Sequence, residues 1–350
     1  MTAVQMGLLK KLNLRATVFD GVTFSFLGLV LLTVLFSPTE EQLLELSRNS
    51  LLAALFFIAG GALSRVLKAL RVRTWGEHIF LPAHEKSQDW HRPFWSNFWG
   101  WQAALVIGVT SLVAIRTTQV SFRELLDPAG FEGATRLLKG LANPDWSILP
   151  KAVLNMIETI FMAFLATAIA IPIAFVLSFL SARNIMRHPV AYLVYISLRT
   201  VMNVIRSIEA LVWAVIFSVW VGIGPFAGML ALMLHSVASL AKQYSEMVES
   251  IQEGPVEGVL STGANHLQTI WFAIVPQVIL PYISITVYRW DINVRMATVI
   301  GVVGGGGIGT MLMQYQGQGM WPQIGCIVVV IAVVVWLMDQ ASAYLREALK

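Results

Sequence analysis

Long apolar stretches separated by short polar segments make up most of the hydropathy pattern of this chain. Each stretch is close to the roughly 20 residues that an α-helix needs to cross the hydrocarbon core of a bilayer. Eight such stretches can be drawn, over about 17–36, 51–70, 98–115, 152–180, 202–222, 224–245, 281–303 and 322–342. The pattern therefore predicts an all-α, polytopic membrane protein with about eight transmembrane helices.

The composition agrees with a membrane protein and excludes several functions. The 350 residues are 57% hydrophobic and only 13% charged, whereas a soluble domain carries about 25% charged residues. The net charge of +4 comes without a basic cluster interleaved with exposed aromatic residues, so we expect no nucleic-acid partner. Cys326 is the only cysteine, which excludes an internal disulfide and any cysteine-based metal site, and we expect no metal.

The distribution of Lys and Arg predicts the orientation, because these residues favour the cytoplasmic side of a membrane. They precede the first stretch and follow the second, the fourth and the last: Lys10, Lys11, Arg15, Arg65, Lys68, Arg71, Arg73, Lys86, Arg92, Arg183, Arg187, Arg346 and Lys350. Eight spans with both termini in the cytoplasm agree with these positions. The sequence "LFSPTEEQ" after the first stretch offers no small-residue cleavage site, so we expect a retained anchor rather than a signal peptide.

One cytoplasmic loop is acidic although the chain is basic. In the segment "YSEMVESIQEGPVEGVLSTGANHLQTIWFAIVPQ", residues 244–277, four glutamates meet a single nearby cation, Lys242. Glu246, Glu249 and Glu253 are three and four residues apart, which predicts one helical face. The loop either contacts a partner protein or is an ordinary solvated loop whose acidic side chains lie on its solvent-exposed face.

Local chemistry predicts the secondary structure of this loop. Gly254 is expected to end the first helix, and Pro255 suits the first turn of the next. Residues 256–262 then form a short second helix, with Gly263 placed to cap its end. A further helix starts at Asn265 and runs to Pro276. The result is a compact helix–turn–helix on the cytoplasmic side.

The order Glu257-Gly258-Val259, Gly263 and Ala273-Ile274-Val275-Pro276 resembles the "EAA" loop of permease subunits of ATP-binding-cassette importers. Glu257, Gly263 and Pro276 hold the family's register, while two of its alanines, its isoleucine and its leucine are replaced. In that family the loop docks into a groove on the ATPase subunit. The resemblance therefore implies an ATPase-coupling surface made of Glu253, Glu257, Gly258, Val259, Gly263, Ala264, Asn265 and Pro276.

Further motifs narrow the resemblance. "NPDWS", "RSIEALVWAVIF", "GIGPFAGMLALMLHSV", "EGPVEGVLSTGA" and "YRWDINVRMATVIGVVGGGGIG" are similar to the phosphonate-transport permeases (PhnE-like), from about Asn143 to the C-terminus. Those permeases usually read Arg-Ser-Ile-Pro-Glu-Leu, whereas here Glu209 follows Ile208 directly. The missing proline predicts a straighter helix at this point.

The resemblance implies a type I importer permease core over 151–350. Residues 1–115 form an N-terminal membrane region with spans that short members of the family lack, and the count of spans predicts that 116–150 is an extracytoplasmic segment. The resemblance also implies a homodimer that binds two ATPase subunits and an extracytoplasmic substrate-binding protein. The cargo would be phosphonate or the related oxyanions phosphite and phosphate. The chain itself would be no enzyme and bind no cofactor, since ATP-Mg belongs to the partner ATPase.

The segment "YRWDINVR" holds the candidate translocation pathway. If its helix begins near Pro281, the polar residues Arg289, Asp291, Asn293 and Arg295 fall near mid-membrane, where a charge costs about 2.5–3.5 kcal/mol on insertion scales. Hydropathy alone also allows the span to end earlier, which would leave them at the interface. Two cations against one carboxylate suit an anion pathway, because a guanidinium binds oxyanions in bidentate fashion.

Within this segment Asp291 and Arg295 are four residues apart and can pair, whereas Arg289 has no partner on its own helical face. Arg206, Glu209 and His235 complete the candidate pathway. For His235, in the sixth stretch, a packed histidine is the alternative.

The glycine-rich run 301–309 lacks the Gly-Lys-Ser/Thr ending of a nucleotide-binding loop. It predicts a flexible break at which two helices approach or hinge, with Gly304, Gly305, Gly306 and Gly307 as the hinge or gate. A different function is a secondary transporter or channel for a small anion without an ATPase. An intramembrane enzyme has no supporting motif, since neither a His-Glu-x-x-His sequence nor a nucleophile elbow is present.

Overall fold

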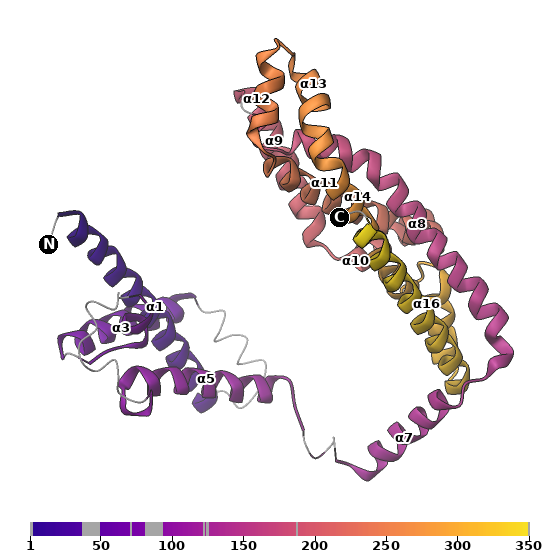
Figure 1. The fold of residues 1–350 in the computed structure, drawn as a ribbon. Coiled ribbons are helices and arrows are strands. Elements are labelled where there is room, and N and C mark those ends of the chain that lie inside the picture. The colour runs from indigo at the N-terminus through magenta and orange to yellow at the C-terminus, as the bar shows by residue number, and fades with distance from the viewer. Residues whose placement is uncertain are drawn as a thin grey trace. The chain divides into compact units, whose positions relative to one another are not determined.

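The computed structural model describes residues 3–36, 50–70, 72–80, 94–121, 123, 126–186 and 188–348, and in these ranges every regular element is a helix (Figure 1). The chain divides into two compact units, Met1–Asp127 and Pro128–Lys350. The border thus lies inside the segment 116–150. Several residues used to predict the orientation or the retained anchor lie outside the described ranges: Arg71, Lys86, Arg92, Arg187, Lys350 and residues 37–42 of "LFSPTEEQ".

The N-terminal unit is built on two antiparallel helices. Its elements are α1 (Ala3–Phe36), α3 (Ser50–Ala69), α4 (Trp75–Phe80), η3 (Phe94–Ser96) and α5 (Phe98–Thr117). Glycines allow α1 and α3 to approach closely: a Cβ on Gly60 would lie 2.8 Å from the carbonyl oxygen of Gly21, and one on Gly28 would lie 2.6 Å from the ring of Phe56. Small residues at a membrane helix interface have this effect.

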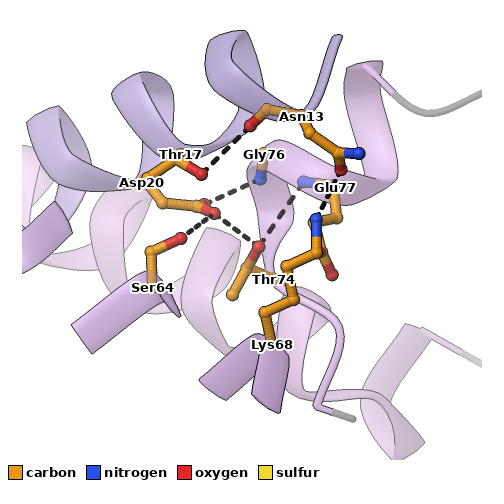
Figure 2. A network of polar contacts seen from close by, with 8 residues as sticks. All are labelled: Asn13, Thr17, Asp20, Ser64, Lys68, Thr74, Gly76 and Glu77. Carbon is orange, nitrogen blue, oxygen red and sulfur yellow. Dashed lines mark hydrogen bonds and ion pairs between the residues drawn. The ribbon is translucent and has the colours of Figure 1, made fainter. Parts of the chain in front are cut away.

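A buried carboxylate ties the elements of this unit together (Figure 2). Asp20 of α1 is fully buried. Its Oδ2 accepts hydrogen bonds from Ser64 Oγ of α3 (3.0 Å) and from Thr74 Oγ1, while its Oδ1 accepts from the N–H of Gly76 (2.8 Å) and from Gln102 Nε2 of α5 (3.3 Å). A buried carboxylate is tolerated when hydrogen-bond donors surround it. Its hydrogen bonds therefore hold the helices of this unit together.

The C-terminal unit is a bundle in which α8 and α11 form the most extensive helix pair. Its elements are α7 (Pro128–Ala142), η4 (Trp146–Ile148), α8 (Leu149–Leu180), α9 (Pro189–Ser207), α10 (Ala210–Val221), α11 (Pro225–Glu249), α12 (Glu253–Ser261), α13 (His266–Thr269), the π-helix η5 (Ile270–Ile274), α14 (Val275–Val302), α15 (Gly307–Gly317) and α16 (Trp321–Ala348).

Small side chains let α8 and α11 pack closely. Buried alanines recur at steps of three, four or seven residues on both helices, on Ala163, Ala166, Ala170 and Ala174 of α8 and on Ala227, Ala231, Ala238 and Ala241 of α11. Such spacing places small residues on one helical face, which brings two backbones together in a membrane. This tight pair forms the scaffold onto which α14 and α15 also pack.

All but one of the predicted spans coincide with single helices, and the all-α fold of a membrane protein is confirmed. In the described ranges five segments are long and apolar enough to cross a membrane: Phe98–Arg116, Trp146–Leu180, Pro225–Glu249, His266–Gly317 and Trp321–Ala348. The bent pair α9–α10 gives a sixth if the two helices form one broken span. Two further predicted spans, 17–36 and 51–70, fall on α1 and α3, so the number of eight crossings stays a prediction.

The helix predicted over 202–222 is not one helix, and the straightening expected from the missing proline is wrong. α9 and α10 meet at an angle of 90°. Ile208 (φ −92°, ψ 124°) and Glu209 (φ −63°, ψ 145°) are extended between them. The corner is held by Trp213, whose Nε1 donates to the carbonyl oxygen of Ile205 across it (3.2 Å). Tertiary contacts therefore form the bend without proline.

The helix α7 belongs to the C-terminal unit because it packs on the start of α16. A Cβ on Gly140 would lie 2.6 Å from Cβ of Trp321. Just after α7, Asp145 accepts hydrogen bonds from the N–H of Ser147 (3.0 Å) and from Gln323 Nε2 of α16 (3.0 Å). The hydrogen bonds from Ser147 hold the pKa of the Asp145 carboxyl below its usual value.

Candidate functional site

The acidic loop is a helical hairpin, but its first break comes earlier than the sequence predicts. α11 ends at Glu249, Gln252 is extended (φ −75°, ψ 134°), and α12 begins at Glu253. The prediction that Gly254 ends the first helix is therefore wrong. Gly254 and Pro255 lie in the first turn of α12, where the missing N–H of proline is tolerated. Glu253 consequently begins the new helix instead of sharing a face with Glu249.

The turn after α12 has the predicted chemistry. Gly263 has φ +80°, a left-handed conformation that glycine adopts without strain, and its N–H donates to the carbonyl oxygen of Leu260 (3.0 Å). Asn265 caps α13 through a reciprocal pair with Gln268, in which each backbone N–H donates to the other's side chain at 2.9 Å. Local sequence signals were sufficient to find both residues.

The helix that starts after Asn265 does not end at Pro276. α13, η5 and α14 follow one another directly, so the helical path continues to Val302. Pro276 lies in the first turn of α14, just after the wider turn of η5. Because the first turn of a helix needs no N–H from proline, Pro276 is accommodated without a break. The hairpin is thus continuous with the helix that carries Arg289.

The base of the hairpin is clamped to its own chain. Glu249 Oε1 accepts from Arg199 Nη1 of α9 (2.7 Å) and from the N–H of Arg183 (2.9 Å). Gln277 of α14 accepts from the N–H of Gln252 through Oε1 (3.0 Å). Glu249 thus joins the end of α11 to α9, and Gln252 joins the start of α12 to α14.

Two of the four glutamates of the loop form ion pairs, and two form none among the described residues. Glu249 is paired with Arg199, and Glu246 lies 3.8 Å from Lys242 on its own helix. Glu253 and Glu257 are exposed and have no ion pair among the described residues. The other predicted coupling residues lie around them: Gly258, Gly263, Asn265 and Pro276 are exposed, and Val259 and Ala264 are half-buried.

Arg289 lies at the middle of α14 and is 9% exposed. α14 continues beyond "YRWDINVR" to Val302, but whether these residues lie near mid-membrane or at the interface stays a prediction. The expectation that Arg289 has no partner on its own helix holds only for α14, since α11 supplies two: Arg289 Nε donates to Ser236 Oγ (3.2 Å) and Nη2 to His235 Nδ1 (2.6 Å).

The contact with Arg289 fixes the state of His235. A guanidinium is only a donor, so Nδ1 of the imidazole must be the acceptor and the ring must be neutral. His235 is half-buried and joins α11 to α14 through this hydrogen bond.

Asn293 continues the network one turn further along α14. It is fully buried, and its Nδ2 donates to Thr167 Oγ1 of α8 and to Ser236 Oγ of α11, each at 2.8 Å. The polar contacts thus join α8, α11 and α14 at one level. Thr167 and Ser236 were missed from the sequence, because single hydroxyls in apolar helices carry no distinguishing signal.

The charges around this network are more balanced than the sequence indicates. Arg295 Nη2 binds Asp291 and also Asp339 Oδ1 of α16 (3.1 Å). Glu209 is exposed at the corner between α9 and α10. Arg295 therefore has two carboxylate partners, Asp291 and Asp339, where the sequence indicated only Asp291. Asp339 was missed because it comes from another helix.

The chemistry of this site depends on the N–H donors of Arg289 that have no partner among the described residues. A guanidinium has five N–H donors. Among the described residues, two hydrogen bonds from Arg289 are present, those to Ser236 and His235. The remaining three N–H groups are available to another acceptor, and the two existing bonds fix the orientation of the fork. Such a group suits reversible contact with an oxyanion.

The glycine-rich run is a buried turn between α14 and α15. Gly304, Gly306 and Gly307 have φ of +89°, +81° and +68°. A Cβ on Gly306 would lie 2.5 Å from Cγ of Pro225, and one on Gly307 would lie 2.3 Å from Thr159 Oγ1. No side chain fits at either position. Gly305 is buried as well and Gly304 is half-buried; the role of this turn as a hinge or gate stays a prediction.

Metal chemistry finds no support in the described ranges, where no group of three or more His, Cys, Asp or Glu side chains is placed to hold an ion. Cys326 is a buried side chain of α16.

Comparison with known proteins gives the class to which this fold and site belong. Residues 174–349 match the family described as "Binding-protein-dependent transport system inner membrane component". The chain belongs to this family and is a membrane-spanning permease subunit of a transport system. Its fold is similar to that of the permease in inward-facing structures of the MetNI methionine ABC transporter, with a TM-score of 0.52 and 22% identity over 59% of this chain and 99% of that one.

Several curated relatives are permeases named for phosphorus compounds. The chain is 35% identical over 272 residues to the "Phosphite transport system permease protein PtxC" of Stutzerimonas stutzeri, covering 77% of this chain and 97% of the relative. It is 35% identical to the "Phosphate-import permease protein PhnE" of Mycolicibacterium smegmatis over 55% of this chain and 36% of that protein. It is 45% identical to the "Putative cryptic phosphonate transport system permease protein PhnE2" of Escherichia coli over 34% and 98%.

These findings confirm the predicted family and give the alternative of a secondary transporter no support.

Proposed function

We propose that this chain is the permease subunit of an ATP-driven importer that carries phosphite, phosphonate or phosphate across the inner membrane. The observation that carries the substrate class is the similarity to the phosphite permease over nearly the whole of that relative. The buried Arg289 with open donors supplies chemistry that such a cargo requires, because a guanidinium matches two oxygens of a phosphorus oxyanion.

The family supports the following assembly. Two copies of this chain form the membrane part, two ATPase subunits bind ATP-Mg on the cytoplasmic side, and a substrate-binding protein delivers the oxyanion from outside. Both termini of the chain lie in the cytoplasm. A pairing with a paralogous permease instead of a second copy would be seen as two different permease chains in the purified transporter.

The hairpin α12–α13 is the ATPase-coupling element. Its exposed acids Glu253 and Glu257 face the ATPase, while the positive φ of Gly263 keeps the turn short enough to enter a groove. Because Glu249 joins the end of α11 to α9 and Gln252 joins the start of α12 to α14, we expect the hairpin to move together with both helices. Closure of the ATPase pair is thereby transmitted along α14 to the level of Arg289.

The pathway contains Arg289 as the contact to the oxyanion. Ser236 and His235 hold its guanidinium in place. An arriving oxyanion would accept hydrogen bonds from the remaining N–H groups of the same side chain.

The substrate class is tested by reconstituting the complete transporter in proteoliposomes with its ATPase and binding protein. ATP hydrolysis is expected to rise when the binding protein is loaded with phosphite, a phosphonate or phosphate. Sulfate, which has a similar shape but no phosphorus, serves as the control and should give little stimulation. Equal stimulation by sulfate, or none by any of the three phosphorus compounds, would contradict the proposal.

A further inference from the structure

A basic groove lies at one end of the α1–α3 hairpin of the N-terminal unit. It has a volume of about 550 Å³ and is lined by the first turns of the described part of α1 and by the last turns of α3. Four cationic side chains contribute to its wall: Lys10, Lys11, Arg65 and Lys68. The apolar side chain of Leu14 contributes to it as well. The site proposed for transport involves none of these residues.

Most of this positive charge is uncompensated. Lys68 is bound by Glu77 of α4 (3.3 Å) and by the side-chain oxygen of Asn13. Lys10, Lys11 and Arg65 are exposed, and no residue in the described ranges forms an ion pair with them. Three free cations around one groove repel one another, so an anion that enters the groove is bound favourably.

The groove has a fixed shape before any ligand arrives. Next to it, Thr17 Oγ1 donates to the carbonyl oxygen of Asn13 (3.0 Å), and the Asp20 network holds α1 to α3 and α4 (Figure 2). The two helices that carry the free cations therefore cannot move apart. Pre-organisation of this kind improves affinity because less ordering is needed on binding.

An apolar stripe continues from the groove along α1. Leu14, Val18 and Val22 follow Lys10 at four-residue steps, and their exposed fractions are 60%, 46% and 53%. Residues four apart lie on one face of a helix. The stripe therefore presents an apolar surface that begins at a cluster of cations, which matches the acyl chain and headgroup of a phospholipid.

We propose that this groove binds the phosphate group of an anionic phospholipid, with an acyl chain along the stripe of Leu14, Val18 and Val22. Basic pockets beside transmembrane helices bind anionic headgroups, with about 1 kcal/mol from each Lys or Arg near the surface. A free phosphorus oxyanion shares the phosphate chemistry of the headgroup. The apolar stripe favours the lipid, since a free oxyanion would leave it unused.

The test uses the complete transporter, delipidated in detergent and examined by native mass spectrometry during titration with phosphatidylglycerol or phosphatidylcholine. The triple variant Lys10→Gln, Lys11→Gln, Arg65→Gln removes the free cations and spares Lys68 and the Asp20 network. Its affinity for phosphatidylglycerol is expected to fall at least tenfold, with little change for phosphatidylcholine. The matched control removes three exposed cations elsewhere, in the variant Arg116→Gln, Arg136→Gln, Lys139→Gln.

Wild-type affinity in the triple variant, or an equal loss in the control variant, would overturn the proposal. If millimolar inorganic phosphate displaces phosphatidylglycerol from the wild-type transporter, the proposal is also overturned, because the groove would then be a site for free oxyanions. If the triple variant unfolds at a lower temperature than wild type, the single variant Arg65→Gln is measured instead. Its affinity for phosphatidylglycerol is expected to fall about fivefold, and an unchanged affinity would refute the lipid site.

Discussion

Asp20 and Arg289 are both charged side chains buried among helices, but their partners differ. Asp20 is surrounded by four donors from α3, α4, α5 and the segment before α4, so both of its oxygens are fully used. Arg289 has two partners and keeps three donors open. A saturated buried charge holds structure together, whereas an unsaturated one can bind a transported ion. The same distinction separates Glu249, which is paired, from Glu257, which is exposed.

The largest effect is expected for Asp20→Ala. The substitution removes the acceptor of Ser64, Thr74 and the N–H of Gly76, whereas Gln102 Nε2 keeps Thr23 Oγ1. Each unsatisfied buried group costs about 1–3 kcal/mol. We expect severe loss of the folded protein from the membrane, measured as abundance after detergent extraction. Asp20→Asn keeps one acceptor oxygen and should be milder. Wild-type abundance and unfolding temperature of Asp20→Ala would show that the network is not structural.

The second largest effect is expected for substitutions in the coupling hairpin α12–α13, where Glu257 is exposed. Glu257→Arg reverses a charge at the docking surface, and Gly263→Leu places a side chain where φ is +80°. Each variant should insert normally but fail to retain the ATPase during purification and fail to support uptake. Glu132→Arg, on exposed α7, is the control for charge reversal. Co-purification of the ATPase at wild-type yield, with normal uptake, contradicts the coupling role.

A smaller effect is expected for His235→Ala. The guanidinium of Arg289 loses one of its two partners, and a hydrogen bond to a charged group is worth about 1.5–3 kcal/mol. Uptake should fall roughly tenfold at matched protein levels, because the fork is no longer held in one orientation. His235→Gln can still accept a hydrogen bond and should recover part of the activity. Equal uptake by the alanine variant and wild type would remove His235 from the pathway.

The smallest effect is expected for Asp339→Asn. Arg295 keeps its bond to Asp291, and the pair with Asp339 is half-exposed on both sides. Half-exposed ion pairs contribute about 0–1 kcal/mol, so the unfolding temperature and uptake should change little. A loss of uptake as large as that of His235→Ala would mean that the Asp291–Arg295–Asp339 cluster belongs to the pathway.

The sequence predicted what local chemistry determines. Helices follow from apolar stretches because the bilayer fixes their length, and Gly263 and Asn265 follow from the needs of a helix end. The end of α11 was placed at Gly254, because the contacts that shape the base of the hairpin, such as Glu249 with Arg199, join different helices.

Residues that act across helices could not be predicted. Ser236 and His235 lie 53 and 54 positions from Arg289, and a hydroxyl or imidazole in an apolar stretch indicates no particular partner. The corner at Ile208 and Glu209 was missed for a similar reason, since a contact between Trp213 and the backbone across the corner replaces the proline that usually marks such a bend.

The most direct test of the role of Arg289 is to measure the uptake of a phosphorus oxyanion by the variant Arg289→Gln. The complete transporter is reconstituted at matched protein levels, and uptake is measured together with ATP hydrolysis stimulated by the loaded binding protein. Glutamine keeps hydrogen-bonding capacity toward Ser236 but removes the charge and the fork. We predict that uptake falls at least tenfold while the ATPase still co-purifies, in line with the loss of a charge-assisted contact. Unchanged uptake would mean that Arg289, like Asp20, only holds the helices together.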